Sequence, residues 1–277
     1  MRFLHFILSH SIFIAFCALG LCYQTAFVLH TQYNYNLYGF IFFSTICSYN
    51  FYWLLSKFYF TDRRIHLAFI KAHFSFLLLF IISFLGAIFF LFQVSYLIPY
   101  VLVGVSLTLL YSLPLWPFHF AKKLQKIGFF KTVLLAFTWS YITTILPSVS
   151  LLQNSFIPVI LLFLARFCFM LLLCIIFDKR DISVDKSHGL HSLATDTPDK
   201  ILNTIIYAVF ILYLMMGLLL RYHFNDKPQM FAFLITGGFV WWVYTLSLKK
   251  QGYLFYYFLV DGLMLVSATL TLIAGFF

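Results

Sequence analysis

Three aspartates in one polar segment are the residues of this sequence best suited to chemistry. Asp178, Asp181 and Asp185 are separated by three and then four residues, in the run FDKRDISVDKSHGLHSLATD. On a helix this spacing places the three side chains on one face. A stripe of carboxylates repels itself unless a cation binds there, and hard oxygen ligands favour Mg²⁺ shared with a substrate phosphate. The stripe is therefore predicted to be a metal and substrate site.

Basic residues flank this stripe. Lys179, Arg180, Lys186 and His188 lie between or beside the aspartates, and such side chains can bind phosphate oxygens directly. The alternative is a solvated loop in which acids merely balance bases. The scarcity of acids favours a site, because the whole chain contains only eight acidic residues, all of them aspartate.

Two further aspartates in the same segment have a structural explanation. Asp196 and Asp199 stand beside Thr197 and Pro198, which is the pattern of a helix N-terminus. They are predicted to be the cap and first turn of the next helix.

The composition shows what kind of scaffold must position these residues. Of 277 residues, 63% are hydrophobic and 9% are charged, whereas soluble domains carry about 25% charged residues. The chain is therefore expected to be an integral membrane protein. The five cysteines lie in apolar runs without ligand spacing, so they are expected to be small buried hydrophobic residues and not disulfides or metal ligands.

Nine apolar runs are long enough to cross about 30 Å of hydrocarbon as helices. The first follows Arg2 without a signal-peptide cleavage pattern, so it is predicted to be a span. The fold class is thus all-α, with residues 1–277 forming a single transmembrane domain of nine helices. The runs are Phe3–Leu29, Leu37–Phe60, Ile65–Phe92, Val94–Trp116, Phe129–Val149, Phe156–Phe177, Ile201–Leu220, Met230–Leu248 and Tyr253–Phe277.

The basic residues predict the orientation of these spans. Fifteen of the 18 Lys and Arg residues fall on one side, Arg221 and Lys227 fall on the other, and Arg166 lies within a span. Basic loops face the cytoplasm, so the N-terminus and the loops at about 57–71, 117–131 and 178–200 are predicted to be cytoplasmic, in the cell (inner) membrane. The net charge of +10 is then a consequence of topology, and no nucleic-acid partner is expected.

The aspartate segment resembles the second motif of the UbiA superfamily of intramembrane prenyltransferases. That motif is DxxDxxxD followed by Gly and then Thr/Ser-Leu, and Gly189 and Ser192-Leu193 follow the aspartates here. The stretch Tyr111 to Pro114, read Tyr-Ser-Leu-Pro, followed by Lys122, Lys123 and Gly128 is also similar to the family. CDP-alcohol phosphotransferases also use aspartate motifs, but their accompanying Gly and Ala-Arg pair are absent.

The resemblance implies a fold and a function. UbiA-like enzymes have nine membrane helices, with aspartate motifs after helices two and six. Asp178, Asp181 and Asp185 would be the catalytic residues and Mg²⁺ ligands. Tyr111, Lys122, Lys123 and Arg180 would bind the substrate, together with Asn50 of the first motif; Lys57 is a further candidate for binding the substrate. The partners would be a prenyl diphosphate and a lipophilic acceptor, beside the bilayer.

The family's first motif, NDxxDxxxD, is incomplete at the end of the second run. Asn50 is present, but the aspartate positions hold Phe51, Leu54 and Phe58. One hypothesis is that Lys57, two turns after Asn50, binds the diphosphate instead. A second is that Asp62 with Arg63 and Arg64 replaces the lost ligands.

A third interpretation is that the motif has decayed. Lys57 would then reach toward the membrane interface, and Asn50 would be a hydrogen bonder between helices.

The function hypothesis from the whole resemblance is an Mg²⁺-dependent prenyltransferase, and the alternative is an inactive UbiA-like protein that binds isoprenoid lipid or a membrane partner. Tyr49, Tyr52, Trp53 and Tyr111 are candidate aromatic walls for an allylic cation.

Two charges lie inside the apolar runs. Arg166 and Asp261 are expected at similar depths, and buried charges in membranes are usually paired, so an Arg166–Asp261 salt bridge is predicted. His66 and His73 share a helical face, but haem between helices needs histidines on two spans at matched depth. No haem is therefore expected.

Overall fold

The computed structural model describes residues 2–60, 71, 73–112, 128–153, 155–187, 191–224 and 227–277. Regular structure in these ranges is helical, without a strand, which confirms the all-α prediction. The described chain falls into two compact units. Unit 1 contains Met1–Leu19 and Asn34–Leu124, and unit 2 contains Gly20–Tyr33 and Gln125–Phe277.

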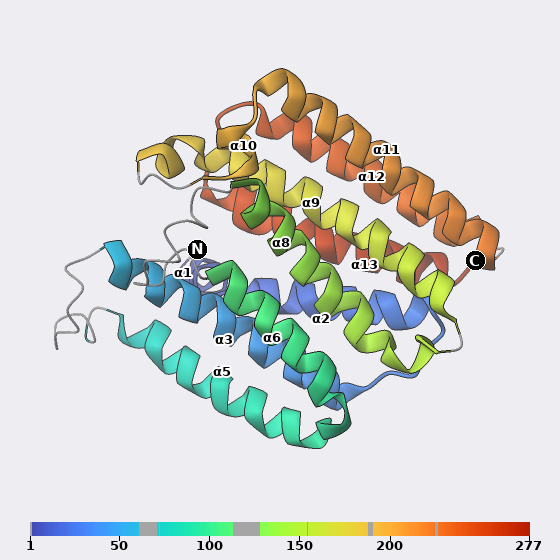
Figure 1. The fold of residues 1–277 in the computed structure, drawn as a ribbon, viewed down its shortest axis with the longest axis horizontal. Coiled ribbons are helices and arrows are strands. Elements are labelled where there is room, and N and C mark those ends of the chain that lie inside the picture. Colours follow the sequence, from blue (N-terminus) through green and yellow to red (C-terminus); the bar gives the residue numbers. More distant parts are fainter. Residues whose placement is uncertain are drawn as a thin grey trace. The chain divides into compact units, whose positions relative to one another are not determined.

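Unit 1 is built around a pair of long helices, α3 and α5, which lie side by side (Figure 1). The unit also includes the first part of α2. Its elements are α1 (Arg2–Ser9), α2 (Ile12–Val28), α3 (Tyr35–Phe60), α5 (Phe74–Gln93), the turn η1 (Ser95–Leu97) and α6 (Ile98–Ser112).

Glycines allow α3 and α5 to approach closely. A Cβ added at Gly39 would lie 2.7 Å from the Phe90 ring, and one added at Gly86 would lie 2.8 Å from the Phe43 ring. The two phenylalanine rings stack with centroids 5.7 Å apart. Each helix thus presents a glycine to an aromatic ring of the other, and small residues of this kind bring membrane helices together.

The break between α1 and α2 is held by hydrogen bonds. The two helices bend by 66°, and Ser11 has a positive φ of 63°. The His10 ring stacks on Phe76 with centroids 4.2 Å apart, and its Nε2 lies 2.9 Å from Ser75 Oγ. Asn50 Nδ2 donates to the His10 carbonyl at 3.1 Å, which satisfies a backbone acceptor that the broken helix leaves open.

Unit 2 is organised around α9, which packs against α8, α10 and α11 (Figure 1). α11 and α12 form a neighbouring antiparallel pair, and α12 also packs on α13. The elements are α8 (Gly128–Ser140), η3 (Tyr141–Ile145), η4 (Leu146–Leu151), α9 (Phe156–Ser187), α10 (Leu193–Asp196), α11 (Asp199–Phe224), α12 (Lys227–Ser247), η5 (Phe255–Val260) and α13 (Asp261–Ala274).

Among the described residues, seven helical segments are long and apolar enough to cross a bilayer, and an eighth is added if the bent α1–α2 pair is one span. This confirms a multi-pass membrane protein. Helix α3 is long enough, at 26 residues, but it is less apolar than these segments, since it carries Asn36, Asn50 and Lys57 among several tyrosines. The count of nine spans and the cytoplasmic N-terminus remain predictions.

The glycine contacts of unit 1 generate a stability prediction. Gly86→Val should lower the thermal unfolding midpoint of the purified protein, because the new methyl groups overlap the Phe43 ring and overpacking costs about 1–3 kcal/mol. Gly238→Val is the matched control, since nothing lies within 4 Å of a Cβ added there. Adding Phe43→Ala to Gly86→Val should recover part of the loss, and a Gly86 variant as stable as the control would contradict this packing.

Candidate functional site

The three aspartates lie on one continuous helix, as their spacing predicts. α9 runs for 32 residues through Ser187, which is about 48 Å of helix against about 30 Å of hydrocarbon. The aspartates occupy its last three turns, beyond the apolar run. Asp185 is buried, while Ser183 and Val184 are exposed. The aspartate face is therefore turned toward the protein.

Asp178 is tied to α8 and, through it, to α10. Thr132 Oγ1 donates to Asp178 Oδ2 at 2.5 Å and accepts the Leu193 backbone N–H at 3.2 Å. Lys131, the neighbour of Thr132, adds electrostatic attraction to Asp178. One threonine hydroxyl thus connects the aspartate helix to the segment that follows it.

A second connection joins the start of α8 to α10. The Gly128 N–H donates to Asp196 Oδ2 at 3.1 Å, and Asp196 Oδ1 lies 2.7 Å from His191 Nδ1. A Cβ at Gly128 would lie 2.6 Å from the Ser192 carbonyl oxygen and would also overlap the Ser192 nitrogen. Only glycine fits this close approach of backbones.

α10 begins with hydrogen bonds between Ser192 and Thr195. The side chain of Thr195 accepts the Ser192 backbone N–H at 2.7 Å, and the Thr195 backbone N–H donates to the Ser192 carbonyl at 3.2 Å. Asp196 was expected to cap the next helix, but it ends α10 and accepts from Gly128 instead. Asp199 does lie in the first turn of α11, as predicted.

Arg180 and Asp181 form a closed pair. Arg180 Nε and Nη2 donate to the two carboxylate oxygens of Asp181, each at 2.7 Å. The guanidinium also lies over the rings of Phe177, Tyr256 and Tyr257, at 4.9, 4.9 and 5.0 Å from their centroids. Such contacts between a cation and aromatic faces are attractive, so α9, η5 and their rings surround the charge of Arg180.

The three aspartates were predicted to hold Mg²⁺ together. In the part of the chain that the structure describes, no three His, Cys, Asp or Glu side chains lie together as a metal-binding group. Both oxygens of Asp181 accept from Arg180, and one oxygen of Asp178 accepts from Thr132. The aspartates as arranged here do not fit a shared metal ion, and Mg²⁺ binding stays a prediction.

With this geometry in place, the chain was compared with known proteins. No protein-family model matches it, and neither a curated protein nor a solved structure does.

The candidate residues of unit 1 lie near the ends of α3 and α6. Asn50 is fully buried and donates to the Ile46 and His10 carbonyls, which is the helix-packing role. Lys57 is exposed, with its Nζ 5.5 Å from the Trp53 ring centroid. Tyr111 stacks on Tyr52 with centroids 5.3 Å apart. The structure therefore brings together two of the predicted aromatic walls.

Several predicted residues lie outside the described ranges. They include the basic pair Lys122 and Lys123, and most of the loop 117–131. Near the first motif, the alternative ligands Asp62, Arg63 and Arg64 also lie outside these ranges. The same holds for Leu113 and Pro114 of the Tyr-Ser-Leu-Pro stretch, for His188 and Gly189 of the second aspartate segment, and for His66 of the haem alternative.

The predicted Arg166–Asp261 salt bridge is wrong. Arg166 Nη2 donates to Gln24 Oε1 at 2.8 Å and contacts Thr25 Oγ1 at 3.5 Å. Both partners are neutral and come from α2. The error has a physical reason: similar depth along two helices does not place two side chains on facing surfaces.

Sequence reasoning missed the residues that hold the site together. Thr132 and Gly128 lie at the start of a predicted span, where threonine and glycine are common and do not indicate a functional site. Gln24 gave a usable signal, because a carboxamide inside an apolar run needs hydrogen-bond partners. The sequence does not show which residues those partners are.

The Thr132 hydrogen bonds generate a second prediction. Thr132→Val keeps the side-chain shape but leaves Asp178 and the Leu193 N–H without this partner, at a cost of about 1–3 kcal/mol. Amide hydrogen exchange of residues 191–196 should accelerate, and the unfolding midpoint should fall. Thr132→Ser keeps the hydroxyl and should exchange like wild type. Equal exchange in the valine and serine variants would show that this hydroxyl does not secure α10.

Proposed function

We propose that this chain is a UbiA-like membrane prenyltransferase, which transfers an isoprenyl group from a prenyl diphosphate to a lipophilic acceptor. The observation that carries the proposal is the end of α9. Three carboxylates share one face there, and Arg180 and Lys131 stand beside them. The resemblance of this segment to the second UbiA motif links these charges to diphosphate chemistry.

Arg180 is suited to bind the diphosphate. Its guanidinium holds Asp181 through two parallel hydrogen bonds, and the same fork binds phosphate oxygens bidentately. Asp181 therefore occupies the position that a phosphate group would take. On substrate binding, Arg180 would exchange the carboxylate for the diphosphate, and Asp181 would become available to other groups in the site.

The rings beside Arg180 suit the next step. As the diphosphate departs, the prenyl group becomes an allylic cation, and aromatic faces stabilise a cation without trapping it covalently. Phe177, Tyr256 and Tyr257 already hold a cation. Dependence on Mg²⁺ enters the proposal only through the resemblance.

A second candidate is favoured by two specific observations. The first-motif aspartate positions hold Phe51, Leu54 and Phe58, and the charged groups of Arg180 and Asp181 satisfy each other. A protein of this kind would bind isoprenoid diphosphate or lipid without turnover, or serve as a membrane partner. Activity and binding must therefore be measured separately.

The test uses the purified full chain, a radiolabelled prenyl diphosphate and a panel of lipophilic acceptors, with and without Mg²⁺. Wild type should transfer the label, and Asp181→Ala should abolish transfer. Arg180→Gln should lower turnover by about 10²–10³, the loss typical for a removed charge-stabilising donor. Ser183→Ala is the matched control on α9, because Ser183 is exposed beside the aspartate face, and it should behave like wild type.

Binding distinguishes the two candidates. A prenyl diphosphate analogue that binds wild type but is never turned over, across the acceptor panel, supports the non-catalytic protein. Equal binding by wild type, Asp181→Ala and Lys57→Ala would contradict a substrate site at either motif.

A further inference from the structure

Arg180 is held by two kinds of partner. Asp181 accepts from its Nε and Nη2 at 2.7 Å each, and three aromatic rings lie against its guanidinium with centroids 4.9 to 5.0 Å away. The proposed function requires the diphosphate to displace Asp181. At that step the carboxylate no longer holds Arg180, so other groups must keep the guanidinium in place.

The three rings come from two elements. Phe177 precedes Arg180 by three residues on α9 and belongs to the same helix. Tyr256 and Tyr257 belong to η5, a π-helical segment, and such segments are rare and frequent at functional sites. Because η5 is a separate element from α9, its tyrosines can fix the direction of the Arg180 side chain relative to the rest of unit 2.

Tyr257 differs from the other two rings in what it offers Arg180. Its hydroxyl is a hydrogen-bond partner of the guanidinium, in addition to the face of its ring. A guanidinium only donates hydrogen bonds, so the phenol oxygen accepts. This contact adds no negative charge beside Arg180, whereas a carboxylate in the same place would repel a diphosphate.

The Tyr257 ring is itself held in place. It stacks on Tyr253 with centroids 4.4 Å apart, and the Phe177 ring meets it edge-on with centroids 6.1 Å apart. Aromatic pairs in these arrangements attract each other. Tyr257 is therefore fixed by contacts that do not involve Asp181, and it remains as a support when that carboxylate leaves.

Asp261 is the competing support for Arg180. It was predicted to pair with Arg166, but it interacts electrostatically with Arg180 and with Tyr253. It is buried at the first residue of α13, directly after η5. A carboxylate there attracts the guanidinium through its charge, so an experiment must separate its effect from that of Tyr257.

We propose that Tyr257 is a positioning residue, which holds the Arg180 guanidinium in the direction that binds the diphosphate once Asp181 has left. This inference rests on the proposed function, because it names the support that the exchange at Arg180 needs. It applies equally to the non-catalytic candidate, which binds a diphosphate without turnover. Tyr257 acts through Arg180 and does not itself contact the diphosphate.

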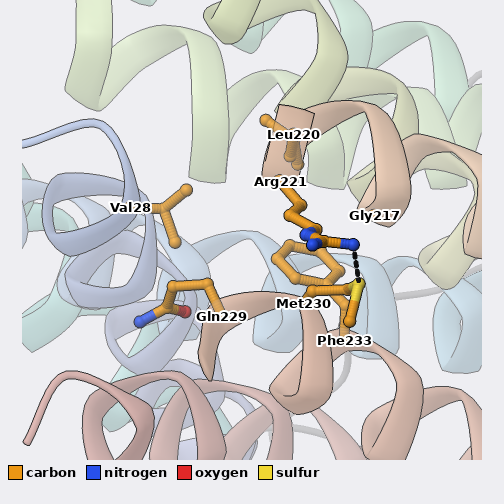
Figure 2. Close-up of a pocket in the computed structure, with 7 residues that line it drawn as sticks. All are labelled: Val28, Gly217, Leu220, Arg221, Gln229, Met230 and Phe233. Carbon is orange, nitrogen blue, oxygen red and sulfur yellow. Dashed lines mark hydrogen bonds between the residues drawn. The ribbon is translucent and has the colours of Figure 1, made fainter. Parts of the chain in front are cut away.

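The far end of α11 and α12 supplies matched controls. Figure 2 shows Arg221, in the last turn of α11, bonded to Met230 near the start of α12, and the Nη1 to Sδ contact is 3.7 Å. Tyr244 lies fourteen residues further along α12, about 21 Å, and there the Lys179 ammonium of the aspartate end lies 5.4 Å from its ring centroid. Arg221 and its neighbour Tyr222, which is 90% exposed, are thus remote from the site.

The test measures binding of inorganic pyrophosphate to the purified full chain by isothermal titration calorimetry, with and without Mg²⁺. Tyr257→Phe removes only the hydroxyl and should weaken binding about tenfold, because a hydrogen bond to a charged group is lost. Arg180→Gln should weaken binding at least as much. Adding Tyr257→Phe to Arg180→Gln should change nothing further, since residues that act as a unit are not additive. Tyr222→Phe and Arg221→Gln should bind like wild type.

Turnover gives a readout that a general loss of structure would not give. In the transfer assay, Tyr257→Phe should raise KM for the prenyl diphosphate about tenfold and leave KM for the acceptor unchanged. A wild type that binds pyrophosphate without transferring the label would contradict the enzyme, while a weaker-binding Tyr257→Phe would still support the positioning role.

Equal pyrophosphate binding by wild type and Tyr257→Phe would overturn the inference and leave the proposed function intact. An effect of Tyr257→Phe that is fully additive with that of Arg180→Gln would also overturn it, because Tyr257 would then act independently of Arg180. Weaker binding by Asp261→Asn alone, with Tyr257→Phe unchanged, would assign the support to Asp261. No binding by wild type would overturn both the inference and the proposed function.

Discussion

The constraint on which unit 2 depends is that a polar group inside a membrane protein must find its partners within the protein. α9 carries this constraint along its whole length. In its middle, Arg166 is held by Gln24, whose amide is in turn held by Ser267 and Thr271 of α13. Near its end, Asp178 is held by Thr132 of α8. Polar contacts therefore join α2, α8, α9 and α13, while apolar packing fills the space between them.

The same constraint explains why the candidate site is closed in this structure. Near the membrane boundary, a carboxylate stripe without a ligand repels itself, and the chain relieves this repulsion with its own donors. Thr132 serves Asp178, and Arg180 serves Asp181 through a fork that would equally suit a phosphate. Under the proposed function, a diphosphate would have to displace Asp181 from Arg180. Binding and turnover would then both depend on Arg180.

Periodicity and charge allowed much of this to be predicted. The all-α class followed from composition, and the 3+4 spacing of the aspartates correctly predicted one helical face, because α9 continues through Ser187. The plain interpretation of Asn50 as a hydrogen bonder between helices also agrees with its contacts to His10 and Ile46. The pairing of Arg166 with Asp261 was wrong, since depth along a helix says nothing about direction around it.

The sequence by itself determined the membrane setting, the helices and the position of the aspartates on one of them, because hydrophobic runs and helical periodicity are local properties of the chain. Only the tertiary structure decided which donors meet which acceptors. Gly128 meets Asp196 across 68 residues, and Gln24 meets Arg166 across 142. Contacts at such separations depend on how helices pack and rotate against one another, and the polar residues that make them look ordinary until their partners are in place.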